Sequence, residues 1–391
     1  MSDLRKKDKN VLLKNKKRPL YCWKNSLFGF PNVGNSCYMN SFLQILLHTP
    51  HFVDTLKESN IGFSRGTLIN LLIEISEYPN LYSLKKIKNI MAEEDNSYGR
   101  EVQNDSQEFG ICLINKIITI IKGNLSFEEE RNEEEIDTII NKDYKIQKYI
   151  NYKNKYCKKD IQLDEMFQFH EIMFNIDLND NNIGRYKSID FNSFLNIELT
   201  FPNRGKKNSY DLTELLKTKY PKNPMVKINK EDINSNVKFS DIIKNKFFEF
   251  IELLKSIFCS CNNINEDEFD TNNIDLFYTN LVSLPNILII SINRAFLGKN
   301  IINKRLIFKE TLDLKDYIEN DFLDGEKETK YKLYGVNLCY KNFMNYGHYY
   351  SYVKINDNWY KFNDDKPIVK ETPEFDSKYV VGLYYIKENF I

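Results

Sequence analysis

The sequence predicts an α+β fold, in which helices come first and antiparallel strands follow. Apolar residues recur at helical spacing in the first third of the chain, and aromatic and β-branched segments with partial alternation follow from about Phe167. The 391 residues are 42% hydrophobic, with 27 Phe and 25 Tyr. This composition supplies a large buried core and excludes disorder as the main state.

The charge balance excludes a general nucleic-acid binder. Lys and Arg number 55, as do Asp and Glu, so the formal net charge is zero, whereas affinity dominated by phosphate contacts needs a surplus of cations. The seven Cys are scattered and odd in number, which indicates a reducing compartment and not a disulfide scaffold. We expect an intracellular protein, cytoplasmic or nuclear, with no membrane segment and no secretion signal.

The helical part is predicted from three amphipathic segments. They are CYMNSFLQILLH at 37–48, TLINLLIEI at 67–75 and NDSQEFGICLINKIITII at 104–121. Asp105 or Ser106 is the expected N-cap of the last helix, with Glu108 in its first turn. The Glu-rich run at 128–135 and the charge-patterned stretch DYKIQKYINYKNKYCKKD after it indicate a surface insertion or a mobile connection with a solvated face.

The later part is predicted to be antiparallel strands. Segments with strand composition include FHEIMFNIDL, FLNIELTFP, LYGVNLCY, HYYSYVKI and YVVGLYYIK, and all are rich in aromatic or β-branched residues. No Gly/Ser-rich or Pro-rich linker interrupts the chain, so we expect one elaborated domain, 21–391, after a basic and disordered N-terminal extension, 1–20.

Cys37 is the candidate nucleophile. It stands between a turn that contains Asn32, Gly34 and Asn35 and the start of the first amphipathic helix. The positive end of the helix macrodipole and its free backbone N–H groups favour a thiolate over a thiol. The same groups can receive a developing oxyanion, and the Asn32 amide can add a donor. On position alone, a small apolar residue that fills a helix start is the more common alternative.

His348 is the candidate base among four His, because it follows a Gly-containing loop and begins a strand. The hairpin that it opens, HYYSYVKINDNWYKFNDD, returns Asn363 and Asp364 beside it through a turn around residues 356–358. A carbonyl oxygen at that position can accept a hydrogen bond from the imidazole and fix its orientation.

These residues belong to longer motifs that carry a family resemblance. GFPNVGNSCYMNSFLQILLHTPHF resembles the cysteine box of the ubiquitin-specific proteases, and YKLYGVNLCYKNFMNYGHYYSYVKINDNWYKFNDDKPIV resembles their histidine box. VQNDSQEF is similar to the family's Gln-x-Asp-x-x-Glu-Phe box, LPNILIISINRAF to its Leu-Pro-x-Ile-Leu strand followed by Arg-Phe, and VGLYYIK to its closing strand. The motifs occur in family order over residues 29–386.

The resemblance implies a role for each catalytic candidate. Cys37 matches the nucleophile, His348 the general base and Asn363 the third triad position. Asn32 matches the side chain that helps to bind the oxyanion. Asp364 is left open as a residue that assists or replaces Asn363.

The resemblance also implies substrate contacts. Asp105 and Glu108 match acidic positions that meet the arginine-containing tail of ubiquitin, while Gly347 and Tyr349 match residues that line the narrow channel for its terminal Gly-Gly. The implied architecture is papain-like and elaborated into a helical thumb, about 29–160, β-rich fingers, about 165–285, and a palm, about 286–391.

The implied activity is thiol-dependent hydrolysis of the isopeptide or peptide bond after the C-terminal glycine of ubiquitin. The implied partners are ubiquitin and ubiquitinated proteins, and we expect a monomeric catalytic domain without direct nucleic-acid binding. The alternatives are a catalytically inactive ubiquitin-binding module and a protease for another ubiquitin-like modifier.

The fingers depart from the family pattern. Many members carry two CxxC pairs that make a tetrahedral zinc site. Here the first pair is missing and the second is reduced to Cys259-Ser260-Cys261, a spacing that is poor for one tetrahedral ion. We therefore expect no cofactor and a metal-free finger, with Cys259 and Cys261 as the only remnant.

Overall fold

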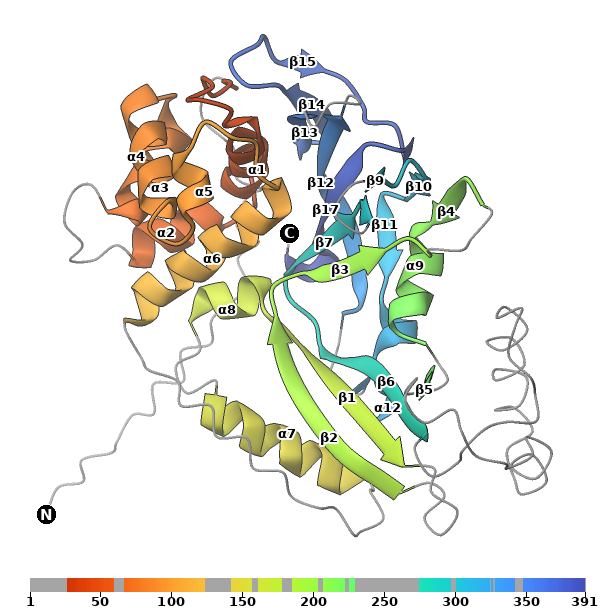
Figure 1. The fold of residues 1–391 in the computed structure, drawn as a ribbon. Helices are drawn as coiled ribbons and strands as arrows, with labels where there is room; N and C mark the ends of the chain where they lie inside the picture. Colours follow the sequence, from red (N-terminus) through yellow and green to blue (C-terminus); the bar gives the residue numbers. More distant parts are fainter. Residues whose placement is uncertain are drawn as a thin grey trace, which may run out of the picture.

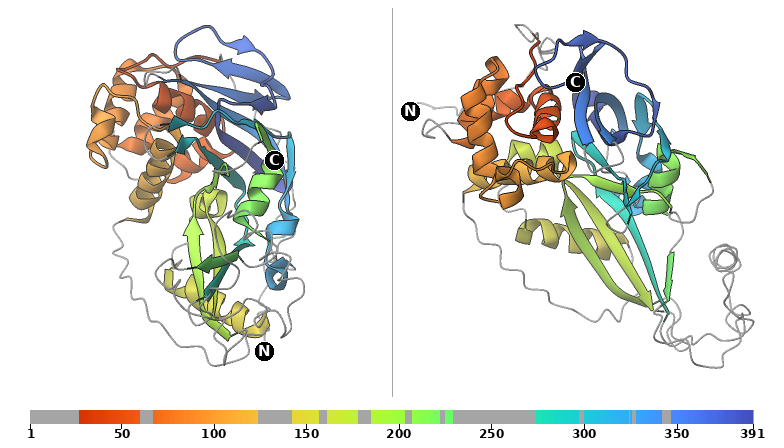
Figure 2. Two further views of the ribbon diagram at one scale, coloured as in Figure 1. Left: turned by 45° about the vertical axis from the view of Figure 1, so that its right-hand side comes forward. Right: turned by 45° about the horizontal axis from the view of Figure 1, so that its top comes forward.

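In the computed structural model of this protein, helices lie on one side of a large sheet and a second sheet extends away from both (Figures 1 and 2). The structure describes residues 27–59, 67–123, 142–156, 161–177, 185–202, 207–221, 225–228, 274–296, 300–323, 325, 328–341 and 347–390. The expected N-terminal extension 1–20, the Glu-rich run 128–135, Cys259 and Cys261 lie outside these residues.

The first layer is helical, as predicted. Its helices are α1 (Cys37–Leu47), α2 (Phe52–Ser59), α3 (Leu68–Glu77), α4 (Leu81–Met91), α5 (Asn96–Gly99), α6 (Ser106–Lys122) and α8 (Gln162–Phe167). Every side chain of α1 is buried, because the other helices and the large sheet enclose it. Helix α6 begins at the predicted N-cap Asp105, whose carboxylate accepts from the backbone N–H groups of Gln107 and Glu108.

Helices α1 and α6 approach closely at Gly110. A Cβ atom at that position would lie 1.9 Å from the ring of Phe42 on α1. The absent side chain thus lets the α6 backbone pack directly on the aromatic ring, and this contact fixes the cysteine-bearing helix against its neighbour.

The large sheet has eight strands. In spatial order they are β15 (Val369–Lys370), β14 (Asn358–Phe362), β13 (Gly347–Ile355), β12 (Lys330–Lys341), β17 (Val380–Lys387), β7 (Ile287–Asn293) and β3 (Ile197–Thr200), with β11 (Thr311–Asp313) paired to β12. All pairs are antiparallel except β3 with β7. This arrangement confirms the α+β prediction.

The predicted hairpin is present at one side of this sheet. Strands β13 and β14 pair from Ser351 opposite Phe362 to Ile355 opposite Asn358. The two turn residues, Asn356 and Asp357, both have positive φ angles, 49° and 63°, as a two-residue hairpin turn requires. The hairpin therefore carries Asn363 back toward the start of β13.

A four-stranded sheet in the order β2-β1-β6-β5 forms the lower part of Figure 1. Its strands are β1 (Phe169–Asp177), β2 (Arg185–Phe194), β5 (Met225–Ile228) and β6 (Ile274–Ser283). Helix α7 (Lys142–Tyr156) packs on it through Tyr144, Tyr149 and Tyr152. The expectation that this charge-patterned stretch is only a solvated insertion is wrong here, because its tyrosines share one helix face and cover the sheet.

The expected boundaries between thumb, fingers and palm stay a prediction, and α7 and β3 are examples of elements that cross them. Helix α7 falls in the range given to the thumb but packs on the four-stranded sheet. Its Lys145 also forms ion pairs, at 2.8 and 2.9 Å, with Glu319 and Asp321, which lie outside that sheet. Strand β3 falls in the range given to the fingers but belongs to the large sheet.

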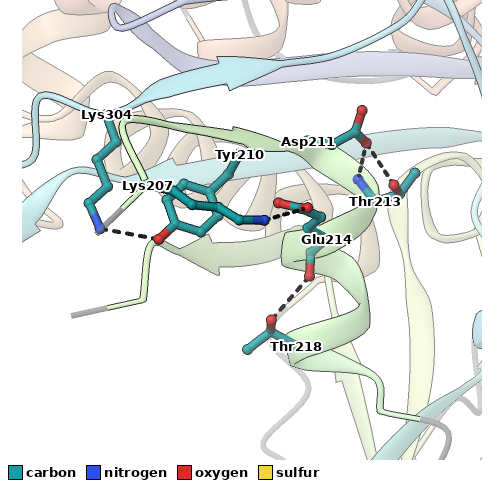
Figure 3. A network of polar contacts seen from close by, with 7 residues as sticks. All are labelled: Lys207, Tyr210, Asp211, Thr213, Glu214, Thr218 and Lys304. Atoms are coloured by element: carbon teal, nitrogen blue, oxygen red, sulfur yellow. Dashed lines mark hydrogen bonds and ion pairs between the residues drawn. The ribbon is translucent and has the colours of Figure 1, made fainter. Parts of the chain in front are cut away.

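The edge of the molecule beyond the large sheet holds β4 (Ser209–Asp211), α9 (Leu212–Lys219), β10 (Arg305–Ile307) and β16 (Asp376–Ser377). Asp211 caps α9 by accepting from the backbone N–H and the hydroxyl of Thr213 at 2.9 and 2.6 Å, while Lys207 pairs with Glu214 at 2.9 Å (Figure 3). Within the described residues, no helix has both the length and the apolar character needed to cross a membrane.

Candidate active site

A tight loop of residues 32–36 delivers Cys37 to the start of α1. Gly34 and Asn35 both have positive φ angles, 83° and 47°, which Gly adopts freely and Asn tolerates. The loop is closed by two hydrogen bonds, in which the backbone N–H of Ser36 donates to Asn32 Oδ1 at 3.0 Å and that of Val33 donates to Ser36 Oγ at 2.8 Å. Local sequence thus dictates the approach to the nucleophile.

His348, Asn363 and Cys37 come together, although they lie on three different elements. His348 Nε2 donates to Asn363 Oδ1 at 2.6 Å, and the imidazole also forms a side-chain hydrogen bond with Cys37. Since Nε2 is engaged with Asn363, Nδ1 is the nitrogen left for the thiol. Cys37 itself is only 3% exposed.

The surroundings of His348 favour its charged form. The hydrogen bond with Cys37 raises the pKa of His348 most, partial burial lowers it, and the contact with Asn363 and the charge of Asp364 raise it, so the pKa lies at about 8, against 6.5 ordinarily. The imidazolium therefore persists at neutral pH, where a thiolate partner and a proton donor are both useful.

Asp364 does not bind His348; it binds the cysteine segment. Its carboxylate accepts from Asn32 Nδ2 at 3.0 Å and from Asn40 Nδ2 at 2.8 Å. In this geometry Asn363 contacts the ring, while Asp364 contacts the side chain expected at the oxyanion; the expectation that Asp364 assists or replaces Asn363 stays a prediction. An amide nitrogen carries two hydrogens, so Asn32 Nδ2 keeps one more to donate.

Three further residues support the site and were not singled out from the sequence. Asn40 also donates to the backbone carbonyls of Phe30 and Pro31 at 3.1 and 3.2 Å. Lys88 and Gln103 reach the backbone on either side of the site, Lys88 at Val33 and Gly34 and Gln103 at Gly347. The position of Lys88 on the buried face of α4 was a sequence signal that could have identified it. The only such signal for Gln103 was its place within the VQNDSQEF motif.

A groove of about 1090 Å³ lies between α6 and the large sheet, and Cys37, His348 and Asn363 are not among the residues that line it. Asp105 and Glu108 line it from the start of α6, and Glu94 and Glu198 add two more carboxylates. Lys116, Arg294 and Lys378 also line it, so its charge is mixed. Both acidic residues singled out from the sequence are thus on its wall and exposed.

The two residues expected at the Gly-Gly channel differ in placement. Gly347 begins β13, directly before His348, and is buried. Tyr349 is 3% exposed and belongs to the larger hydrophobic core, next to Cys339. The structure therefore gives Tyr349 a packing contact beneath the histidine strand, and its expected contact with the ubiquitin tail stays a prediction.

Most of this chain is similar to known proteins of one family. The family model of ubiquitin carboxyl-terminal hydrolases matches residues 28–385. The chain is 35% identical over 106 residues to ubiquitin carboxyl-terminal hydrolase 16 of Arabidopsis thaliana, and 31% identical over 115 residues to ubiquitin carboxyl-terminal hydrolase 29 of Mus musculus. These alignments cover 26% of this chain in both cases, and 10% and 13% of the relatives.

The fold is similar to solved structures of one assembly. The SAGA Ubp8/Sgf11/Sus1/Sgf73 DUB module bound to ubiquitin aldehyde matches with a TM-score of 0.59 and 19% identity, covering 93% of this chain and 70% of that chain. The Ubp8-Sgf11-Sgf73-Sus1 SAGA DUB module matches with a TM-score of 0.57 and 18% identity, covering 93% and 68%. The family model spans nearly the entire described fold and both site-bearing segments, so this chain belongs to the ubiquitin carboxyl-terminal hydrolase family.

Proposed function

We propose that this protein is a thiol-dependent deubiquitinating peptidase, which hydrolyses the isopeptide or peptide bond after the C-terminal glycine of ubiquitin. The observation that carries the proposal is the contact of His348 with both Cys37 and Asn363. A Cys, a His and an orienting amide in this order of contact form a complete Cys-His-Asn site. An inactive ubiquitin-binding module has no need of all three.

In the first half of the reaction, the Cys37 thiolate attacks the carbonyl carbon of the terminal glycine. The carbonyl electron pair moves to oxygen, where the backbone N–H of Cys37 and the second N–H of Asn32 Nδ2 are the proposed donors. When the tetrahedral intermediate collapses, the C–N bond breaks and the His348 imidazolium gives its proton to the departing amine. Cys37 is left as a thioester with ubiquitin.

In the second half, His348 is neutral and takes a proton from water. The resulting hydroxide attacks the thioester carbonyl, the C–S bond breaks, and the products are free ubiquitin and the Cys37 thiolate. Asn363 contacts Nε2 at 2.6 Å, and in the proposed reaction this contact is kept in both halves, so Nδ1 stays directed at the reacting atoms. A neutral amide suffices there because the pair already separates charge as thiolate and imidazolium.

The groove supports ubiquitin as the substrate class. Asp105 and Glu108 are exposed on its wall, where they can pair with a cationic peptide tail. Deubiquitinating modules bound to ubiquitin share the fold, and the curated relatives are named ubiquitin carboxyl-terminal hydrolases. We also propose an intracellular setting, because a catalytic thiol and seven scattered Cys are suited to a reducing compartment.

The test is adduct formation with a ubiquitin C-terminal electrophile, measured by mass spectrometry, for the wild-type protein and the Cys37→Ala variant. We expect one adduct per wild-type chain and none for the variant. A folded wild-type protein that forms no adduct would overturn the proposal, and reaction with a probe built on another modifier in its place would identify the alternative substrate.

A further inference from the structure

One amide side chain bridges the helical layer and the histidine strand. Gln103 Nε2 donates to the backbone carbonyl of Gly347, and the backbone N–H of Gly347 donates to Gln103 Oε1 at 2.5 Å. Gly347 is the residue directly before His348. A two-point contact of this kind fixes both the position and the orientation of a peptide backbone, whereas a single hydrogen bond fixes only a distance.

The same loop, residues 100–105, also holds the cysteine segment. The backbone carbonyl of Glu101 accepts from Asn35 Nδ2 at 2.6 Å, and Asn35 lies two residues before Cys37. Glu101 and Gln103 of one short loop therefore hydrogen-bond to the chain just before the candidate nucleophile and just before the candidate base. These hydrogen bonds are additional to the packing between α1 and β13, which brings the two elements together.

A rigid link is needed here because the two reacting groups belong to different layers. Cys37 lies at the start of a helix and His348 is the second residue of a strand, so any sliding of one layer over the other changes the contact between thiol and imidazole. A displacement of about 1 Å in such a pair is enough to cost roughly 100-fold in rate. Gln103 opposes that displacement at the residue next to the ring.

We infer that Gln103 is a positioning residue, which acts through Gly347 to hold His348 in register with Cys37. The inference rests on the proposed function for its meaning in catalysis. It assigns no contact with substrate to Gln103. Its chemical requirement is a side chain that both donates and accepts at fixed reach, and among the standard amino acids Gln supplies this to a backbone peptide at this distance.

The opposite role is a latch. Gly347 is expected to line the channel for the substrate's Gly-Gly tail, so a side chain that occupies its N–H and carbonyl could compete with the tail. The two roles differ in sign. Removing a positioning residue lowers the rate of the chemical step, while removing a latch raises the rate of substrate capture.

Two variants test the inference. Gln103→Ala removes both hydrogen bonds, and Gln103→Glu keeps the acceptor for the Gly347 N–H but sets a carboxylate oxygen against the Gly347 carbonyl. Gln147→Ala is the control, since Gln147 is an exposed glutamine on α7 that bonds only Asn151 among the described residues. Melting curves of all variants show whether each is folded.

The first measurement needs no ubiquitin. The rate at which iodoacetamide alkylates Cys37 is followed against pH by mass spectrometry of the peptide that contains it. In the wild type, we expect substantial alkylation near neutral pH, because a paired imidazolium favours the thiolate. In both Gln103 variants, the profile moves to higher pH, and in the control it does not.

The second measurement is steady-state hydrolysis of a fluorogenic ubiquitin amide. We expect kcat to fall by roughly 10- to 100-fold in both Gln103 variants, with KM changed by less than about threefold. A wild-type rate and an unshifted alkylation profile in the folded variants would overturn the inference, and a faster reaction would overturn it in favour of the latch.

The two proposals fail separately. If the wild type does not hydrolyse ubiquitin but Gln103→Ala still shifts the alkylation profile of Cys37, the proposed function falls and the positioning role stands. If the wild type hydrolyses ubiquitin and both folded Gln103 variants match it in kcat and in alkylation profile, the positioning role alone falls.

Discussion

Asp364 accepts a hydrogen bond from Asn32 Nδ2 at 3.0 Å and so joins the end of the histidine hairpin to the loop before the nucleophile. The backbone is shaped for this contact: Asp364 has a φ of 50°, and a Cβ at Gly29 would lie 2.1 Å from the Asp364 carbonyl oxygen. Two adjacent residues thus contact different parts of the site: Asn363 orients the imidazole and Asp364 orients Asn32.

Replacing Asp364 by Ala should lower kcat with little change in KM. The Asn32 amide would lose the partner that directs its nitrogen, and the oxyanion forms only in the transition state. Loss of an entire oxyanion donor costs about 100- to 1,000-fold in kcat, so we expect a fall of about 10-fold or more from misdirecting one. Steady-state hydrolysis of a fluorogenic ubiquitin amide measures it.

The control for this change is Asp365→Asn, which alters the exposed neighbour and should leave kcat at the wild-type value. If Asp364→Ala changes KM alone, then Asp364 serves substrate binding and the positioning argument fails. Equal losses in Asp364→Ala and Asp365→Asn would point to a general charge effect of the hairpin end.

The pH dependence of His348 is a second prediction. Its pKa is raised to about 8, chiefly by the hydrogen bond with Cys37, so the imidazolium should persist until the pH rises through about 8. Because that proton is needed by the departing amine, kcat/KM should fall above this pH. NMR titration of the His348 ring checks the assignment directly.

The sign of the coupling can be tested in the Cys37→Ala variant. Removing the largest cause of the raised pKa leaves burial, which lowers it, and the contacts with Asn363 and Asp364, which still raise it, so His348 should titrate at a lower pH than in the wild type. Cys112→Ala, which removes another free thiol on α6, should leave the titration where it was. A ring that titrates identically in the Cys37→Ala variant would mean that the two side chains do not interact in solution.

The hairpin shows what the sequence can predict. Asn-Asp at a two-residue turn specifies a left-handed backbone, and once the turn is fixed the register follows, which brings Asn363 to His348. The N-cap of α6 was predictable for the same reason, since Asp105 bonds to groups two and three residues away. Contacts between residues that are close in the sequence can therefore be predicted from the residue types.

The rest depends on how separate layers dock. The sequence around Asp364 does not predict its contacts with Asn32 and Asn40, which lie more than 300 residues away. Helix α7 was missed because its lysines dominate the pattern, although Tyr149 and Tyr152 pack on Phe191 of the sheet. Long amphipathic side chains of this kind reveal their buried face only when a partner surface is known.

Glu108 provides a third prediction, for the groove. It is exposed at the first turn of α6 and, unlike Asp105, it does not cap the helix, so its replacement leaves the fold intact. Glu108→Gln should raise KM for the ubiquitin substrate by roughly 2- to 5-fold, the value of an exposed ion pair, with kcat unchanged. The effect should shrink at high salt.

Glu93→Gln is the matched control, because Glu93 is also exposed but does not line the groove. Steady-state kinetics at low and high salt separate the two. If Glu108→Gln leaves KM unaltered at low salt, the tail of the substrate does not pair with this carboxylate, and the groove binds it by backbone contacts alone.

Lys88 carries the last prediction, on the loop before Cys37. Lys88 is 5% exposed, and its ammonium donates to the backbone carbonyls of Val33 and Gly34 at 3.2 and 2.6 Å. Burial lowers the pKa of Lys88, so the fold retains this cation against a desolvation cost. Lys88→Met relieves that cost but leaves two carbonyls without their donor.

The relieved desolvation and the lost hydrogen bonds have opposite effects on stability, so we expect stability and activity to respond differently to Lys88→Met. The free energy of unfolding of Lys88→Met should change by less than about 3 kcal/mol, because a bond to a charged donor is worth about 1.5 to 3 kcal/mol and the relieved desolvation offsets part of it. The turnover should fall by more than stability alone explains, since the freed loop no longer fixes Asn32 and Cys37. Urea unfolding and kcat, measured beside Lys85→Met at an exposed position of the same helix, decide it: a variant that keeps full kcat would show that the loop holds its shape without the lysine.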